Sequence, residues 1–165
     1  MSIPEKTTPS SRDIELETML LRLSTTGQPN PLYHINFDGC SKGNPGLAGA
    51  GAVLFRDGVE IDHRMQALGK KTNNQAEYAG LLLGLQLAVD HEVRNVEVRG
   101  DSQLIIKQMR GEYRVSNAEL KPLYNLAREL ASNFDHIDFM HVYRKDNARA
   151  DELSNEALHE PINYR

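Results

Sequence analysis

Four acidic residues stand where carboxylates could act together. Asp38 precedes a Gly-rich segment at the end of a predicted strand, and Asp101 follows Gly100 at the end of another. Glu77 and Asp151 fall in the predicted first turns of two helices, where the helix dipole favours negative charge. Taken singly, each is better explained as an ordinary turn or capping residue. Together they can converge on the crevice at the strand ends of an α/β sheet.

Converging carboxylates repel one another, which raises their pKa values or destabilises the fold. A bound divalent cation relieves that repulsion. Oxygen ligands without a cluster of His or Cys suit Mg²⁺ or Mn²⁺ rather than zinc. Because Mg²⁺ completes its shell with water and substrate phosphate, this set of acids indicates phosphate-ester chemistry.

The elements that must position these acids follow from hydrophobic periodicity. Alternation with period two predicts strands over residues 32–38, 48–56, 59–68, 95–99 and 136–143. The pair Asp57-Gly58 predicts a hairpin turn between the second and third strands. Helices are predicted over residues 74–90 (with Ala76, Ala79, Leu83 and Leu87 on one face), 102–110, 121–132 and 147–158. This order predicts an α/β fold, a mixed sheet with helices packed on it.

Local signals predict where the helices begin and end. Gly111 stands where a glycine commonly closes a helix. Ser116 and Glu119 have the spacing of a capping box, but Pro122 suits a first helical turn and places the start of the third helix near Lys121. Asn147 is predicted to cap the last helix, which carries Asp151.

The first thirty residues differ from the rest. Residues 1–12 are rich in Ser, Thr and Pro, and residues 24–31 resemble a linker. Between them an apolar stripe predicts a short amphipathic helix, formed by Leu16, Met19, Leu20 and Leu23. We therefore divide the chain into residues 1–30 (tail, helix and linker) and a catalytic domain of residues 31–165. A helix this short is marginal alone, so we expect it to dock on its own domain, a second subunit or a partner protein.

Composition excludes some classes of protein. With 39% hydrophobic and 25% charged residues the chain is neither disordered nor membrane-like. A net charge of −4 argues mildly against a nucleic-acid binder, but acidity gathered at a metal site would account for it. The single cysteine, Cys40, permits no intrachain disulfide. Without an apolar span or a secretion signal, we expect a cytoplasmic protein that contacts no membrane.

The residues around the four acids resemble four motifs of the type 1 ribonuclease H family. The resemblance covers residues 32–158, in the family's order and spacing. The matching segments are Asp38–Gly46 (DGCSKGNPG), Thr72–Glu77 (TNNQAE), Asp101–Gln103 (DSQ) and Asn147–Ser154 (NARADELS). Four matched motifs are far more specific than any one of them.

The resemblance implies a ribonuclease H-like fold, a five-stranded mixed sheet of order 3-2-1-4-5 with helices on both faces. It implies an endoribonuclease that hydrolyses the RNA strand of RNA–DNA hybrids and leaves 5′-phosphate and 3′-hydroxyl ends. The catalytic residues would hold two Mg²⁺ ions, with Mn²⁺ as a substitute, and are Asp38, Glu77, Asp101 and Asp151. By analogy with the family, one ion activates water and Asp38 bridges both.

The resemblance also indicates how the hybrid duplex would be bound. Asn44, Asn73 and Gln103 match residues that contact the minor groove, where amides suit 2′-hydroxyls and base edges. Thr72 matches a residue that helps to hold a DNA phosphate, and Asn74 joins this substrate-binding set. For Asn73 and Asn74, helix capping is the alternative, and both roles are compatible.

Two departures from the family pattern affect turnover and binding. Many bacterial members carry a histidine on a loop before the fourth motif, but here that stretch holds only the cations Arg144 and Lys145. We expect one of them to take the histidine's place in part, and His141, within the fifth strand, to have a packing or surface role. The basic protrusion of many members is also short here, with only Arg110 and Arg114.

Two other functions are open. One is a related nuclease of the same fold that acts on another duplex. The other is a catalytically silent module that binds hybrids. The complete set of four carboxylates argues against a silent module, because a pure binder gains nothing from negative charge beside phosphates. The matched amides favour contact with RNA over contact with DNA alone.

Overall fold

The structure is a computed structural model that describes residues 12, 15 and 30–159. Of the predicted helix over residues 13–24 only Glu15 is described, and its backbone is helical. The apolar stripe of that helix and its docking lie outside the described residues. The division of the chain after residue 30 stays a prediction.

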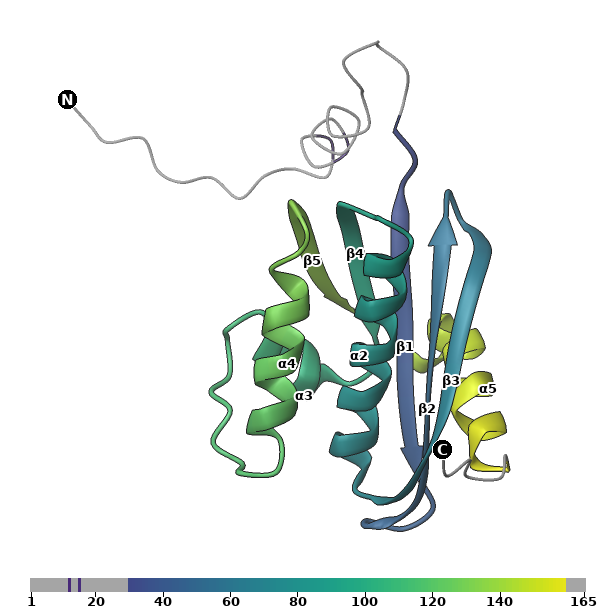
Figure 1. Ribbon diagram of the computed structural model, residues 1–165, viewed down its shortest axis with the longest axis vertical. Coiled ribbons are helices and arrows are strands. Elements are labelled where there is room, and N and C mark those ends of the chain that lie inside the picture. The colour runs from purple at the N-terminus through teal and green to yellow at the C-terminus, as the bar shows by residue number, and fades with distance from the viewer. Residues whose placement is uncertain (1–11, 13–14, 16–29, 160–165) are drawn as a thin grey trace, which may run out of the picture. The chain divides into compact units, whose positions relative to one another are not determined.

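Five strands form one mixed sheet (Figure 1), and its order is β3-β2-β1-β4-β5. The strands are β1 (Tyr33–Ser41), β2 (Gly46–Arg56), β3 (Val59–Lys71), β4 (Asn95–Gly100) and β5 (His136–His141). β1 pairs antiparallel with β2 and parallel with β4, and β4 pairs parallel with β5. The predicted strand order and the mixed character of the sheet are therefore confirmed.

The turn between β2 and β3 is the predicted two-residue hairpin. Asp57 and Gly58 have φ angles of 49° and 80°. A tight turn of this hand needs positive φ at both central residues, which explains the Asp-Gly pair.

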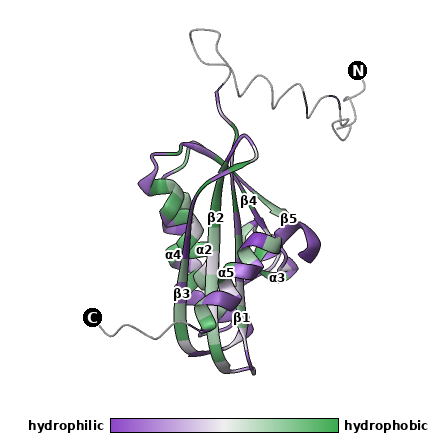
Figure 2. Ribbon diagram, turned by 90° about the vertical axis from the view of Figure 1, so that its right-hand side faces the viewer, coloured by the Kyte–Doolittle hydropathy of each residue, from purple (hydrophilic) through white to green (hydrophobic). Residues whose placement is uncertain are grey.

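Helices cover both faces of the sheet (Figures 1 and 2). They are α2 (Asn73–Asp90), α3 (Gln103–Met109), α4 (Lys121–Ala131) and α5 (Ala148–Leu158), the last preceded by a 3-10 turn, η1 (Arg144–Asn147). On β2, Ala52 lies beside Gly84 of α2, whereas the preceding Gly51 lies beside Leu153 of α5. Because successive strand residues point to opposite faces, α2 and α5 lie on opposite sides, as predicted.

The larger hydrophobic cluster lies between the sheet and helices α2, α3 and α4. Its fully buried side chains include Ile35, Phe37, Leu54, Leu81 and Leu85. Burying one such side chain contributes about 1.5–3 kcal/mol to stability, so this cluster stabilises the packing of the helices on the sheet. A smaller cluster under α5 contains Val53, Ala150 and Leu153. Among the described residues, none of the helices is long and apolar enough to cross a membrane.

The predicted apolar face of α2 is wrong in part. Ala76 and Leu87 are buried, but Ala79 and Leu83 are only partly buried. The helix contacts the sheet on one side and α4 on another. Since α2 is buried on several sides, no single apolar stripe marks the face that meets the sheet.

The ends of α3 and α4 test two further predictions. Gly111 closes α3 as predicted, with a φ of 77° and an N–H that donates to the Gln108 carbonyl. α4 begins at Lys121, as Pro122 predicts, so the capping box of Ser116 and Glu119 is wrong. The Oδ1 atom of Asn117 accepts from the N–H groups of Glu119 and Leu120 instead. This local turn delays the start of the helix.

Candidate active site

The parallel pairing of β1 with β4 brings Asp38 beside Asp101. Phe37 and Gly100 are partners in that pairing, so the residues that follow them are neighbours on adjacent strands. Asp101 directly follows β4, as predicted. Asp38 does not end its strand, because Gly39 and the next two residues still pair with β2 and carry β1 to residue 41.

Glu77 reaches Asp38 because α2 packs very closely on β1. A Cβ atom on Gly39 would lie 2.1 Å from the Ala76 carbonyl, and one on Gly80 would lie 2.3 Å from the Asp38 carbonyl oxygen. Only glycine at both positions permits this approach. Glu77 itself lies beyond the first turn of α2, contrary to prediction, because the helix already begins at Asn73. Packing, rather than the helix dipole, therefore explains its placement.

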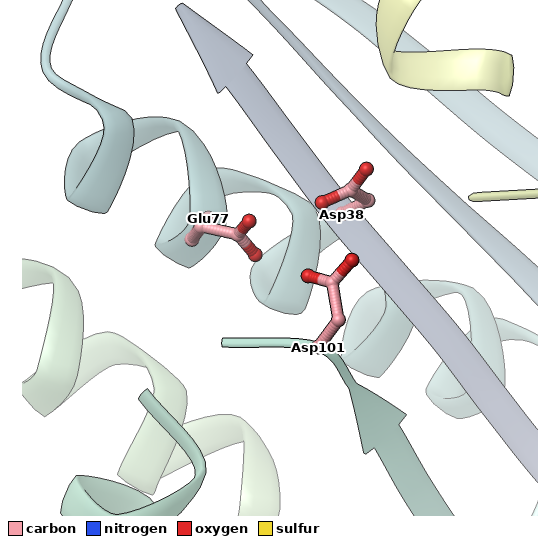
Figure 3. Close-up of side chains that lie close together, drawn as sticks. All are labelled: Asp38, Glu77 and Asp101. Atoms are coloured by element: carbon pink, nitrogen blue, oxygen red, sulfur yellow. The ribbon is translucent and has the colours of Figure 1, made fainter. Parts of the chain in front are cut away.

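Asp38, Glu77 and Asp101 form a compact carboxylate cluster. One oxygen of each lies within 4.8 Å of those of the other two. Figure 3 shows the three side chains pointing toward one another from β1, α2 and the end of β4. Asp38 and Glu77 are only 4% and 9% exposed, and Glu77 Oε2 has no hydrogen-bond partner among the described residues. A buried carboxylate oxygen without a partner fits a divalent cation as its missing partner.

The pKa values of the three carboxyls also indicate that the cluster would bind a cation. Burial, the largest cause, and the nearby charge of Asp101 together raise the pKa of Asp38 to about 7, against a hydrogen bond with Glu77 that lowers it. Burial and the charge of Asp38 raise the pKa of Glu77 well above its ordinary value. Burial is also the main cause of the raised pKa of Asp101. Three ionised carboxylates here would need a positive counter-charge.

Asp151 stands at the rim of the cluster. It lies in the first turn of α5, as predicted, and lines the same cavity of about 330 Å³ as the other three acids. Its Oδ1 atom accepts from Asn155 Nδ2 at 3.3 Å, and an Arg144 guanidinium nitrogen lies 3.7 Å away. The four predicted acids therefore share one cavity, three in direct proximity and the fourth beside them.

Known proteins share this sequence pattern. A family profile described as reverse transcriptase-like matches residues 36–157. Ribonuclease HI of Halobacterium salinarum is 44% identical over 126 residues, which span 76% of this chain and 63% of that protein. The chain belongs to the type 1 ribonuclease H family.

Solved structures of ribonucleases H share the fold. The N-terminal ribonuclease H domain of a Mycobacterium tuberculosis protein, solved as a fusion with maltose-binding protein, aligns with a TM-score of 0.76 and 41% identity, over 78% of this chain and 94% of that one. LC11-RNase H1, solved in complex with an RNA/DNA hybrid, aligns with a TM-score of 0.72 and 37% identity, over 76% and 96%. This chain spans 63% of the length of the Halobacterium protein and 35% of the length of a bifunctional Mycobacterium tuberculosis protein.

Two of the substrate residues that the ribonuclease H resemblance implies are tied to each other. Asn44 Oδ1 accepts from the backbone N–H of Asn73 at 3.1 Å, and Asn73 Oδ1 accepts from the N–H of Ser41 at 3.0 Å. Neither Asn73 nor Asn74 caps α2, because Thr72 does so in a capping box with Gln75, and the capping alternative is wrong. The amide oxygens of Asn44 and Asn73 are thus used within the protein, which leaves their NH₂ groups as the donors for a ligand.

One of the five predicted substrate residues lines the cavity that holds the acids. Asn73 lines the cavity, whereas Asn44, Thr72, Asn74 and Gln103 are not among the residues that line it. Gln103 is exposed as the first residue of α3. Contact of these residues with a hybrid duplex stays a prediction.

Asn147 has another role than the predicted one. It occupies the N-cap position of α5 but makes no capping hydrogen bond. Its buried Nδ2 atom donates to the Phe37 carbonyl at 2.9 Å, which ties the start of α5 to β1. The pattern of a capping Asn cannot reveal this, because Phe37 lies 110 residues away.

Sequence reasoning missed two side chains of α5 at the site. Asn155 Nδ2 donates to the backbone and side-chain oxygens of Asp151, and Ser154 Oγ lies 3.3 Å from Asp38 Oδ2. Their spacing could have revealed them, because residues three and four positions after Asp151 share its face of the helix.

The two cations predicted to stand near the site differ in their position relative to the cavity. Arg144 lines the cavity, whereas Lys145 is not among its lining residues. His141 lies in β5 and is half-buried, with Nε2 3.2 Å from the Asp101 carbonyl oxygen and its ring edge-on to Tyr143. This environment agrees with the packing role expected for His141.

Proposed function

We propose that this chain is an endoribonuclease that hydrolyses the RNA strand of RNA–DNA hybrids and leaves 5′-phosphate and 3′-hydroxyl ends. The observation that carries the proposal is the cluster of Asp38, Glu77 and Asp101, with carboxylate oxygens within 4.8 Å of one another in a chain of the type 1 ribonuclease H family. The hybrid bound to LC11-RNase H1, a relative of 37% identity, supports the choice of substrate.

The four acids would hold two divalent cations, Mg²⁺ or Mn²⁺. Such ions supply positive charge to the attacking and leaving oxygens of an in-line displacement. Asp38 is central, because its charge raises the pKa of Glu77 and the charge of Asp101 raises its own pKa. The buried Glu77 Oε2 atom would gain the partner it lacks among the described residues. Since the pKa of Asp38 is raised to about 7, metal binding at or below neutral pH would release a proton from this carboxyl.

Arg144 is the cation best suited to the position of the loop histidine found in many family members. Its side chain is 80% exposed beside Asp151, so it can move toward a ligand at the rim. A guanidinium stays protonated and cannot accept a proton. Arg144 would therefore hold a phosphate by charge and hydrogen bonding, without taking part in proton transfer.

Of the alternatives, a silent hybrid-binding module is the less favoured. Three clustered carboxylates beside a phosphate backbone would weaken binding rather than strengthen it. A nuclease of the same fold that acts on another duplex has the same acids, so substrate preference must distinguish it.

A cleavage assay tests the proposal. We would incubate the chain with an RNA–DNA hybrid, double-stranded RNA and double-stranded DNA, each labelled on one strand, in Mg²⁺, in Mn²⁺ and in EDTA. We expect cleavage of the RNA strand of the hybrid alone, dependent on metal, with 5′-phosphate and 3′-hydroxyl ends. Equal cutting of duplex DNA would support the related nuclease, and hybrid binding without cleavage in either metal would support the silent module.

A further inference from the structure

Ser154 of α5 contacts the cluster from the side opposite Glu77's helix. Its side chain is 0% exposed, and its Oγ atom lies 3.3 Å from Asp38 Oδ2. We infer that Ser154 is a positioning residue for Asp38: its hydroxyl donates to one carboxylate oxygen and so fixes the direction in which the other faces the metal. This inference rests on the proposed function.

The hydroxyl has one hydrogen and two acceptors within reach. Ser154 Oγ lies 2.9 Å from the Asp151 carbonyl and 3.3 Å from Asp38 Oδ2. The Asp151 carbonyl also accepts from Asn155 Nδ2 at 2.8 Å, so it keeps a partner without Ser154. A hydrogen bond to an ionised acceptor is roughly twice as strong as a neutral one. The hydrogen therefore goes to Asp38 when that carboxylate is ionised, as a metal ligand must be.

Two glycines of β2 bring Ser154 within this distance. A Cβ atom on Gly49 would lie 2.3 Å from the Ser154 carbonyl oxygen, and one on Gly51 would lie 2.9 Å from the Ser154 nitrogen. Gly51 is also the cross-strand partner of Asp38. The α5 backbone thus lies directly on the strand beside Asp38, at a distance that the short Ser side chain spans.

The positioning role of Ser154 determines how much metal affinity its removal should cost. Partners that orient a metal ligand typically change metal affinity or activity about ten- to a hundredfold when removed. Asp38 is itself 4% exposed and Ser154 0%, so water cannot easily replace the lost hydroxyl. A residue that only packs in the smaller cluster would change stability without changing metal affinity.

Mn²⁺ titration of the full chain by calorimetry, without substrate, tests this role. We expect Ser154→Ala to bind Mn²⁺ about ten- to a hundredfold more weakly than the unsubstituted chain. The matched control is Ser132→Ala, because Ser132 Oγ donates to the Glu129 carbonyl three residues earlier in α4, away from the acids. The control should bind Mn²⁺ normally. In hybrid cleavage, Ser154→Ala should need more metal while its KM for the hybrid stays the same.

Binding of Mn²⁺ by Ser154→Ala within about twofold of the unsubstituted chain would overturn the inference and leave the proposed function standing. Absence of Mn²⁺ binding by the unsubstituted chain would overturn both. Should Ser154→Ala fail to fold, Ser154→Thr and Ser154→Val make the same comparison, since they are alike in shape and differ in the hydroxyl. Weaker binding by the Val variant supports the inference, and equal binding by the two overturns it.

Discussion

Carboxylates occur in two contrasting settings in this molecule. In the cluster of Asp38, Glu77 and Asp101 they are close to one another, and two of the three, Asp38 and Glu77, are buried. On β3 and at the end of α2 they are at least partly exposed, and each faces a basic side chain. We call these the edge pairs, which are Glu60–Arg149 (2.7 Å), Asp62–His91 (2.7 Å) and Asp90–Arg64 (2.6 Å).

The pKa values of the two groups shift in opposite directions. Hydrogen bonds from Arg149, His91 and Arg64 lower the pKa values of Glu60, Asp62 and Asp90. In the cluster, burial is the main cause of raised pKa values. An exposed pair is satisfied within the protein and contributes little to stability, because water screens its charges. A buried group of like charges costs stability, and a ligand of opposite charge would offset that cost, which makes the cluster the candidate site of function.

The largest expected effect separates these groups by activity. Asp38→Asn should lower hybrid cleavage about a thousandfold or more, because metal stabilisation of the transition state amounts to several kcal/mol. Asp62→Asn, a matched change among the edge pairs, should leave cleavage within about twofold. Steady-state rates in Mg²⁺ measure both. Substantial activity in Asp38→Asn would mean that the cluster does not hold the catalytic metal.

The next effect concerns stability without metal. The raised pKa of Asp38 means that the folded state binds more protons than the unfolded state between pH 3.8 and about 7, so stability falls as pH rises through that window. Asp38→Asn removes this loss, which amounts to about 1.4 kcal/mol per pKa unit. Its Tm in EDTA should therefore exceed that of the unsubstituted chain by a gap that grows up to about pH 7.

His34 has the opposite slope, because its pKa is lowered to about 4 and its neutral form is favoured by folding. His34 is present in both Asp38→Asn and the unsubstituted chain, so its effect cancels in the difference between their Tm values. Mg²⁺ should close or reverse the gap between them. A gap that does not change with pH would contradict the electrostatic explanation.

A smaller effect is expected at the rim of the cavity. Arg144→Ala should lower kcat/KM about five- to tenfold, since an exposed charge contributes on the order of 1 kcal/mol. Arg144→Lys should retain most of the activity, and Lys145→Ala, outside the cavity lining, serves as the control. Equal losses in Arg144→Ala and Lys145→Ala would point to a general effect of positive charge.

The smallest effect is expected at His141. Its Nε2 atom contacts a backbone carbonyl of Asp101 rather than a carboxylate of the cluster. His141→Ala should therefore change the cleavage rate by no more than about twofold, the result of one weak hydrogen bond. A severe loss of turnover with the fold intact, judged by circular dichroism, would show that this histidine serves the function of the missing loop histidine.

Much of this architecture could be predicted from the residues alone. Local signals act over a few residues and can be recognised in the sequence. They include the alternation along Ile35 and Phe37, the Asp57-Gly58 turn and the glycine after α3. The four motifs identified the acids and, through the family, the strand order. The strand boundaries were less accurate, because Asp38 looks like the last residue of β1 until the pairing of Gly39 with β2 is known.

What only the tertiary structure decided depends on contacts between distant segments. Glu77 reaches Asp38 because Gly39 and Gly80 let α2 lie against β1, although no dipole favours its position. Ser154 and Asp38 are 116 residues apart, and no local pattern links them. Their contact exists because α5 rests on the glycines of β2, and close packing of that kind depends on the shapes of both elements at once. Sequence patterns predict the elements and their chemistry, whereas packing decides which side chains meet.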